Sequence, residues 1–256
     1  MNIALLLSGG RGTRLTSSVP KQYLEAGGCM VVTHTFARLL IHAGIDAVQI
    51  VAEKDWQERI LSDAERYLSE NPKAAGVEKG SRAYLLQRCR GFSSPGDTRQ
   101  LSVYNGLRDI RAYASDDDIV LIHDAARPFV SEETITACLA ACARHDGAMP
   151  ALPMKDTVYL CRKTPAGKSD VSQGQVTGLL ERSAVFAGQA PEAFRFGRYL
   201  AANEALLPDR IYAVNGSSEP AVMAGMDIAL VEGDEGNFKI TTNGDWERAL
   251  RIIEGT

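Results

Sequence analysis

An apolar run that leads directly into a glycine-rich loop opens the chain and most strongly constrains its fold. Residues Ile3–Leu7 are all apolar, and glycines follow at positions 9, 10 and 12. A short continuous apolar run is typical of a strand buried on both faces. Glycines let a backbone come close to a ligand, and the exposed N–H groups of such a loop can hold an anion. The start of the chain therefore predicts an anion-binding loop at the carboxyl end of a first strand.

Two basic residues follow this loop and suit a phosphate group. They are Arg14 and Lys21, and Pro20 stiffens the backbone before Lys21. The dinucleotide fingerprint G-x-G-x-x-G fails because Leu15 stands at the third glycine, and the P-loop pattern is absent. Taken alone, the loop fits a triphosphate cradle and a glycine-rich turn with solvated basic residues equally well.

Strand-like and helix-like segments alternate along most of the chain. This alternation predicts βαβ units, and thus an α/β fold with a Rossmann-like, mostly parallel sheet flanked by helices. The expected strands are Ile3–Leu7, Ala47–Ala52, Ile119–Ile122, Gly147–Leu152 and Ile228–Glu232. The expected helices are Val31–Ala43, Lys54–Ser69, one from an Asp97 or Thr98 cap to Ala114, Ser131–His145, Ala193–Leu206, Ala221–Met226 and Asp245–Ile253.

Two regions depart from this alternation. Glu70–Pro95 is rich in Gly, Pro and Ser, with a strand or short helix at Ala83–Cys89, and is expected to be a surface excursion leading to the sheet edge. Val158–Cys161 and Gln175–Leu180 flank a polar segment, which predicts a projecting hairpin. We expect one domain over residues 1–256 with an arm at about 155–182, and, since such an arm is usually stabilised by a partner, a homodimer.

Composition excludes several classes of protein. The net charge is −4, whereas a general nucleic-acid binder is strongly basic. No apolar run approaches the ~18 residues of a membrane span, and no secretion signal is visible, so we expect no membrane partner. The five cysteines form no C-x-x-C pair and indicate free thiols in a reducing cytoplasm.

Polar residues follow the carboxyl ends of the central strands, where open α/β sheets bind their ligands. His123 and Asp124 end one strand, and the carboxylate there can hold Mg²⁺ together with phosphate oxygens. A helix cap or a salt bridge with Arg127 is the structural alternative for Asp124, and His123 fits a structural role as well as that of a base. Lys239, in an extended segment, is a candidate phosphate ligand or a solvated lysine.

Taken together, these segments resemble the cytidylyltransferase family of isoprenoid precursor synthesis, which makes 4-diphosphocytidyl-2-C-methyl-D-erythritol from CTP and methylerythritol phosphate. Ribitol-5-phosphate cytidylyltransferases are close relatives of that family. The resemblance covers nearly the whole chain. The motifs that carry it are Ser8–Arg14, Pro20–Gln22, Gly96–Arg99, Ser102, His123–Pro128, Asp156–Thr157 and Asn237–Thr241.

The resemblance implies a role for each matching residue. Catalytic cations would be Arg14, Lys21 and Lys239. Nucleotide contacts would come from Ser8, Gly9, Gly10, Gly12, Thr13, Asp97, Ser102 and Asp124, with Asp124 also near Mg²⁺. Contacts to the alcohol phosphate would come from Arg127, Thr157, Arg182 and Ser217, some of them from a partner's arm.

The chain departs from the family pattern on the alcohol-phosphate side. Ser217–Ala221 replaces a motif that usually begins with Thr-Asp, and Ala190 stands where a threonine is usual. Ribitol 5-phosphate or another polyol phosphate of surface-polysaccharide synthesis therefore rivals methylerythritol phosphate as acceptor. Two further classes of protein share a similar αβ layout, namely a nucleotide-binding protein without catalysis and a NAD-linked dehydrogenase.

Overall fold

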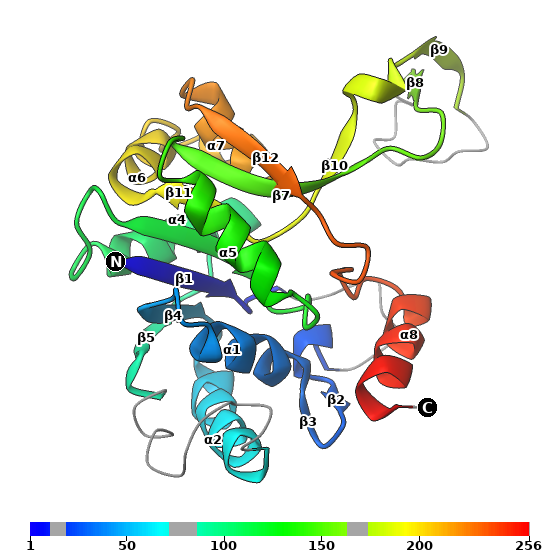
Figure 1. The fold of residues 1–256 in the computed structure, drawn as a ribbon. Helices are drawn as coiled ribbons and strands as arrows, with labels where there is room; N and C mark the ends of the chain where they lie inside the picture. Colours follow the sequence, from blue (N-terminus) through cyan, green and yellow to red (C-terminus); the bar gives the residue numbers. More distant parts are fainter. Residues whose placement is uncertain (11–18, 72–85, 163–173, 256) are drawn as a thin grey trace.

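A mixed, mostly parallel sheet forms the centre of the protein in a computed structural model, which describes residues 1–10, 19–71, 86–162 and 174–255 (Figure 1). Within these ranges the sheet has eight strands in the order β10-β7-β11-β6-β1-β4-β5, with β12 paired to β7. The strands are β1 (Asn2–Leu7), β4 (Ala47–Val51), β5 (Cys89–Ser93), β6 (Ile119–Asp124), β7 (Gly147–Pro153), β10 (Phe186–Gly188), β11 (Glu192–Arg195) and β12 (Ile228–Glu232).

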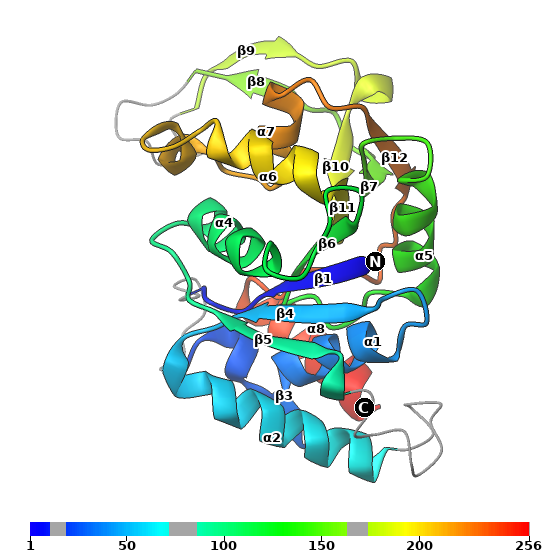
Figure 2. The same ribbon diagram turned by 90° about the vertical axis from the view of Figure 1, so that its left-hand side faces the viewer.

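Helices cover both faces of this sheet (Figure 2). They are α1 (Val31–Ile41), α2 (Lys54–Glu70), α4 (Arg99–Ile110), α5 (Glu132–Ala141), α6 (Phe196–Glu204), α7 (Ser218–Met223) and α8 (Asn243–Glu254). Short 3₁₀ helices lie at Lys21–Tyr23, Arg182–Ala184 and Arg210–Ala213, and a small hairpin joins β2 (Glu25–Ala26) to β3 (Cys29–Met30). No helix in the described ranges combines the length and the apolar character that a membrane crossing requires.

The alternation of side chains along the central strands creates two cores. Successive residues of a strand point to opposite faces. Leu6 and Leu121 therefore pack with α1, α2 and α5 on one face, whereas Leu5 and Ile122 pack with α4, α6 and α7 on the other. All four side chains are fully buried. Burial on both faces explains why these strands are continuously apolar rather than alternating.

The strand order reverses direction between β1 and β6. From β1 the chain adds β4 and then β5 on one side, and it returns to the other side of β1 for β6. Both neighbours pair with β1 in parallel, with Leu7 opposite Val51 and Asp124. Loops leaving adjacent parallel strands in opposite directions leave a crevice at the carboxyl ends, where such folds bind ligands. The fold therefore brings the glycine-rich loop beside Asp124.

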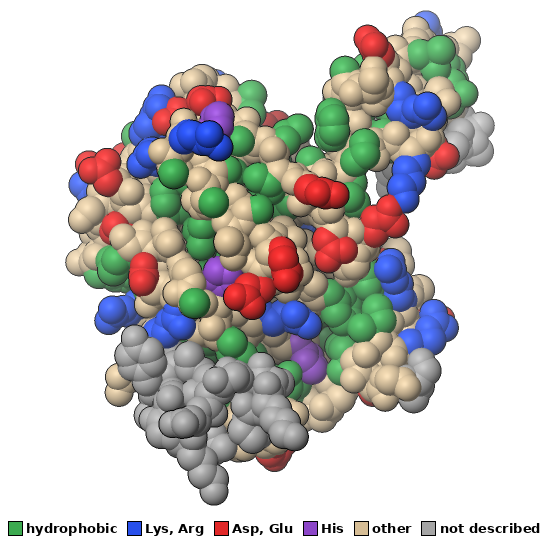
Figure 3. Space-filling model, in the orientation of Figure 1, with side chains coloured by type: hydrophobic (Ala, Val, Ile, Leu, Met, Phe, Trp, Pro, Cys, Tyr) green, Lys and Arg blue, Asp and Glu red, His purple; other side chains and the backbone are tan. Residues whose placement is uncertain are grey.

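A two-stranded hairpin stands away from the main body (Figure 1). It is formed by β8 (Tyr159–Cys161) and β9 (Val176–Leu179), which pair antiparallel with each other outside the main sheet. Its apolar side chains are exposed, among them Tyr159 at 55% and Leu179 at 63%. Figure 3 shows hydrophobic side chains among the charged ones on this projection. The expected hairpin arm is therefore present.

The sequence did not predict the short strands β2, β3 and β10, and two further strands, β5 and β11, differ from what it predicted. The edge strand β5 is formed by residues 89–93, within a segment expected to be irregular, and its Gly91 has a φ of 128°. The helix predicted over Ala193–Leu206 begins only at Phe196, because Glu192–Arg195 form β11, which pairs antiparallel with β6 and β7. Both strands are short and depend on partners distant in sequence, which local periodicity does not reveal.

Candidate functional site

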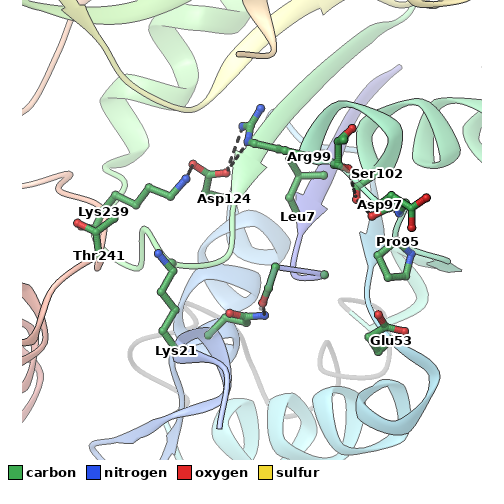
Figure 4. A pocket seen from close by; sticks show the side chains of 16 residues that line it. Leu7, Lys21, Glu53, Pro95, Asp97, Arg99, Ser102, Asp124, Lys239 and Thr241 are labelled. Atoms are coloured by element: carbon green, nitrogen blue, oxygen red, sulfur yellow. Dashed lines mark hydrogen bonds and ion pairs between the residues drawn. The ribbon is translucent and has the colours of Figure 1, made fainter. Parts of the chain in front are cut away.

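A pocket of about 570 Å³ opens at the carboxyl ends of β1, β4 and β6. Its size falls in the range of small-molecule sites, roughly 300–1,000 Å³. It is lined by Leu7, Gly9, Gly10, Lys21, Gln22, Glu53, Pro95, Gly96, Asp97, Thr98, Arg99, Ser102, Asp124, Ala126, Lys239 and Thr241. Seven of the sequence-predicted site residues, from five separate segments of the chain, thus line one cavity (Figure 4).

The described part of the glycine-rich loop is held in place by the segment that follows Pro20. The Gln22 side-chain amide donates to the carbonyl oxygens of Ser8 and Gly10, both at 2.7 Å. The Tyr23 hydroxyl donates to the same Ser8 carbonyl at 2.8 Å. A Cβ at Gly9 would lie 2.4 Å from the Cβ of Pro95, so only glycine fits there. These contacts, together with the bond from the Ser8 amide to the Val51 carbonyl at 2.8 Å, fix the described loop backbone at the pocket wall.

Asp124 lies at the centre of the site with three cations around it. Its Oδ2 accepts from Lys239 Nζ at 2.7 Å, and its Oδ1 accepts from Arg99 Nη2 at 3.1 Å. Arg127 Nε lies 3.7 Å from Oδ2. Burial alone would raise the pKa of Asp124, but the charges of Arg99 and Lys239 outweigh it and hold that pKa well below its usual value. The side chain is therefore an anion under working conditions.

Arg99 joins Asp124 to a second buried acid. Besides its bonds to Asp124, its guanidinium donates to the Ser217 hydroxyl. Glu192 lies behind this contact, 8% exposed, and interacts electrostatically with Arg99. Burial raises the pKa of Glu192. Ser217 thus does not line the pocket itself but is held behind it by Arg99.

The segment before α8 supplies Lys239 and is bonded both to Lys21 and to the turn after β6. Lys21 Nζ donates to the Ile240 carbonyl at 2.6 Å, and the Ile240 amide donates to the Ala126 carbonyl at 2.9 Å. Arg127 donates to the Asn237 carbonyl at 2.7 Å. These bonds join segments that are more than one hundred residues apart in the sequence and hold them next to each other. Lys21 and Lys239 therefore lie on the same side of the pocket (Figure 4).

The first turn of α4 forms the opposite wall. The Thr98 hydroxyl accepts from the Leu101 amide at 3.1 Å, so Thr98 is the N-cap. Ser102 donates to the Thr98 carbonyl at 2.9 Å. Asp97, just before the cap, is exposed at the pocket wall. This wall offers hydroxyl and carboxylate groups, whereas the Lys21 side offers cations.

A divalent ion fits this site with a single protein ligand. The described residues contain no group of three or more His, Cys, Asp or Glu side chains placed to hold a metal. A carboxylate can accept about four hydrogen bonds. Among the residues that the structure describes, Oδ2 of Asp124 accepts one hydrogen bond, from Lys239, and has Arg127 Nε at 3.7 Å. Since Mg²⁺ is often bound by one or two carboxylates together with substrate phosphates, the donor set suits a nucleotide-borne Mg²⁺.

The remaining sequence-predicted residues fall into three groups. Gly12, Thr13 and Arg14 lie outside the described residues. Thr157 and Arg182 are exposed at the arm and do not line the pocket of their own chain, and Arg182 donates to the Lys155 carbonyl at 3.1 Å. His123 is fully buried, and its Nε2 donates to the Arg127 carbonyl at 3.1 Å, which is the structural alternative for this residue.

The sequence did not predict two charged residues of the site, Arg99 in the pocket wall and Glu192 behind it. Arg99 belongs to the motif Gly96–Arg99, but the sequence predicts no role for it, and no sequence pattern singles out Glu192. Arg99 is partly buried, and a partly buried guanidinium is stabilised by an acidic partner, but that partner, Asp124, is 25 residues away in the sequence. Only the tertiary structure identifies it.

Comparison with known proteins gives one family. Residues 2–255 match the family model described as 2-C-methyl-D-erythritol 4-phosphate cytidylyltransferase. A protein of that name from Cereibacter sphaeroides is 33% identical over 98% of this chain and 96% of its own length. A ribitol-5-phosphate cytidylyltransferase from Streptococcus agalactiae is 28% identical over 96% of this chain and 92% of its own length.

Longer and solved relatives agree with this match. A bifunctional enzyme IspD/IspF from Paramagnetospirillum magneticum is 34% identical over 99% of this chain, which spans only 57% of that protein. The crystal structure of a 4-diphosphocytidyl-2C-methyl-D-erythritol synthase from Anaerococcus prevotii superposes with a TM-score of 0.73 at 25% identity, covering 99% of this chain and 96% of that one. The likeness extends over the whole sheet and its helices.

The buried His123 predicts a specific pH dependence of stability. Burial lowers its pKa from 6.5 to about 4. The unfolded chain therefore takes up a proton near pH 6.5 and the folded chain only near pH 4, so stability falls as the pH falls through this window. Between pH 7 and pH 5, we expect this histidine to cost the wild type about 2 kcal/mol of its free energy of unfolding. His123→Gln lacks the titrating group and should not show that loss.

Urea denaturation at a series of pH values measures this difference. The control is Leu121→Ala, which destabilises the same strand without removing a titrating group. Its free energy of unfolding should change with pH as steeply as that of the wild type. Equal slopes for His123→Gln and the wild type would contradict the assignment.

Proposed function

The chain belongs to the 2-C-methyl-D-erythritol 4-phosphate cytidylyltransferase family, and from this premise we propose that it transfers CMP from CTP to 2-C-methyl-D-erythritol 4-phosphate and releases pyrophosphate. The observation that carries the proposal is the pocket at the switch point of the sheet. There Lys21, Lys239 and Arg99 surround one ionised carboxylate, Asp124. Such a site suits a triphosphate and a metal far better than a neutral ligand.

The reaction needs no protein nucleophile. An oxygen of the acceptor phosphate is already anionic and attacks the α-phosphorus of CTP. The new P–O bond forms as the bond between the α-phosphorus and its bridging oxygen breaks, and the electron pair leaves with pyrophosphate. The protein's contribution is then the alignment of two anions and the neutralisation of charge on the transferred phosphoryl group.

In the proposed mechanism the cations divide this work. Lys21 and the backbone N–H groups of Gly9 and Gly10 contact the triphosphate, and Lys239 contacts the α-phosphate next to Asp124. The predicted Arg14, Gly12, Thr13 and Ser8 would complete the phosphate cradle. Asp124 would hold Mg²⁺, which when bound supplies additional positive charge on the phosphate oxygens. Asp97 and Ser102 face the nucleoside.

The acceptor is the finer part of the proposal. Similarity to both the methylerythritol phosphate and the ribitol phosphate enzymes is spread over nearly the whole chain, but the family match favours the former. Arg127 contacts Asp124 and Ser217 contacts Arg99, both just behind the pocket wall that Asp124 and Arg99 form. We propose that this side receives the alcohol phosphate.

A homodimer would complete the acceptor side. Thr157 and Arg182 lie on the exposed arm, outside the pocket of their own chain. The arm carries exposed apolar residues on a hairpin with few contacts to the body, which is the pattern of a segment stabilised by a partner. We propose that each arm packs on the other subunit and presents these two residues there. The five free thiols support a cytoplasmic location.

An assay of pyrophosphate release tests the proposed function. We expect turnover with CTP and 2-C-methyl-D-erythritol 4-phosphate in the presence of Mg²⁺, and much weaker turnover with ribitol 5-phosphate. Chelation of the metal should abolish release. Faster turnover with ribitol 5-phosphate would mean that ribitol 5-phosphate, rather than methylerythritol phosphate, is the acceptor. CTP binding without pyrophosphate release in the presence of any polyol phosphate would refute catalysis.

Lys21→Ala should lower kcat by ~10²–10³ while the fold survives, because one charge-stabilising contact to the transferring group is lost. The matched control is Lys54→Ala, an exposed lysine at the start of α2 that does not line the pocket. Single-turnover measurements with saturating CTP separate the chemical step from binding. Near-wild-type rates for Lys21→Ala would remove this lysine from the mechanism.

Leu179→Asp should weaken the dimer, because it places a charge on the exposed apolar face of the arm. We expect sedimentation to show more monomer and the assay to show a lower turnover that recovers at high protein concentration. Leu61→Asp, a partly exposed leucine on α2, is the control. A wild-type protein that sediments as a monomer at full activity would contradict the role of the arm.

A further inference from the structure

A second buried carboxylate, that of Glu192, lies on the same face of the sheet as Asp124. Glu192 of β11 pairs antiparallel with Ile122 of β6, which stands two residues before Asp124. Directly paired residues project to the same face of a sheet, and so do residues two apart along one strand. Glu192 and Asp124 are therefore diagonal neighbours, a relationship that places such residues roughly 7–8 Å apart. Both are 8% exposed.

Arg99 connects Asp124 with a buried hydroxyl group. It is the first residue of α4, which covers this face of the sheet. Its Nε and Nη2 donate to Asp124 Oδ1 at 3.3 and 3.1 Å, and its Nη1 donates to the Ser217 hydroxyl. One edge of the guanidinium thus bonds to Asp124, as Figure 4 shows, and the remaining nitrogen reaches Ser217.

The Ser217 hydroxyl links Arg99 to Glu192. Ser217 is only 1% exposed, and a hydroxyl that accepts a hydrogen bond from Arg99 keeps its own proton to donate. Burial raises the pKa of Glu192. The charge of Arg99 and the hydroxyls of Ser217 and Ser218 act in the opposite direction, because they favour the ionised form of this acid. Arg99 therefore faces two carboxylates, one directly and one through the Ser217 hydroxyl.

The charges around Asp124 show what a second carboxylate can do there. Asp124 alone balances only one of the cations that surround it, which are Arg99, Lys239 and Arg127. An excess of positive charge attracts a triphosphate but opposes a divalent cation at the same carboxylate. Glu192 reduces this excess, since its charge interacts with Arg99 and also with Arg127.

We propose that Glu192 is a positioning residue for the metal-bound nucleotide, an inference that rests on the proposed function. Through Ser217 it holds the Arg99 guanidinium in the pocket wall, and it shares the charge of that guanidinium with Asp124. Asp124 thereby retains the negative charge that a divalent ion beside the triphosphate requires. Glu192 does not line the pocket, so it acts through Arg99 and touches neither substrate.

Substitution by glutamine removes the charge without changing the shape of the side chain. Glu192→Gln keeps an acceptor oxygen for the Ser217 hydroxyl, so the fold should survive. Calorimetry without acceptor compares the affinity for CTP in saturating Mg²⁺ with that in EDTA. Loss of a negative charge disfavours the cation and favours the free triphosphate, so we expect the ratio of the two affinities to fall roughly tenfold while the affinity in EDTA stays equal or rises. Glu204→Gln, an exposed acid on α6 outside the pocket, removes the same charge and should leave the ratio unchanged.

A second substitution returns the charge to the same place. The Ser218 hydroxyl acts on the Glu192 carboxylate, so an acidic side chain at position 218 would place a negative charge next to residue 192. We expect Glu192→Gln combined with Ser218→Asp to recover most of the lost ratio. A double variant that behaves like Glu192→Gln alone would contradict the role of charge.

The outcomes separate this inference from the proposed function. An unchanged ratio in Glu192→Gln would overturn the inference, and so would equal losses of CTP affinity in Mg²⁺ and in EDTA, which indicate structural damage. A wild type that transfers CMP but binds CTP equally well in Mg²⁺ and in EDTA would overturn the inference and leave the transfer reaction standing. The expected fall in the ratio, without CMP transfer to any polyol phosphate, would support the inference while refuting the proposed function.

Discussion

The ion cluster around Asp124 is the interaction on which the rest of the site depends. A buried carboxylate is costly unless cations and hydrogen bonds compensate for its lost hydration. Here the compensation comes from α4 through Arg99, from the segment before α8 through Lys239, and from the turn after β6 through Arg127. One side chain at the end of β6 thus holds two distant segments and its own following turn together, and each of the three contributes a cation to the cluster.

This cluster is possible because of the sheet topology. Asp124 ends a fully buried strand, opposite Leu7 at the end of β1, so the carboxylate and the glycine-rich loop leave the sheet side by side. The loop alone could be an ordinary turn. Gly9 and Gly10 line the same pocket as Asp124, Lys21 and Lys239, and this position is what supports the proposed role of the loop in binding phosphate.

Much of this arrangement could be predicted from the sequence, because the central strands and their terminal residues are local patterns. The apolar runs of β1 and β6, the Thr98 cap and the convergence of Gly9, Lys21, Asp124 and Lys239 on one cavity all follow from local pattern and the rule for open sheets. What failed depends on long-range pairing. The strand β11 exists only because β6 and β7 accept it between them, and Arg99 acquires its role only from Asp124.

The two halves of the pocket are built differently, and this bears on how acceptor preference varies among relatives. The half proposed to bind the nucleotide is made of strand ends and the capped start of α4, and hydrogen bonds to the backbone fix it, as Gln22 fixes the glycine-rich loop. In the proposed mechanism the acceptor half combines Ser217, held by Arg99, with residues of an exposed arm. Substitutions on such an arm disturb few core contacts. The acceptor can therefore change while the nucleotide half stays constant, consistent with similarity to methylerythritol phosphate and ribitol phosphate enzymes across the same span of this chain.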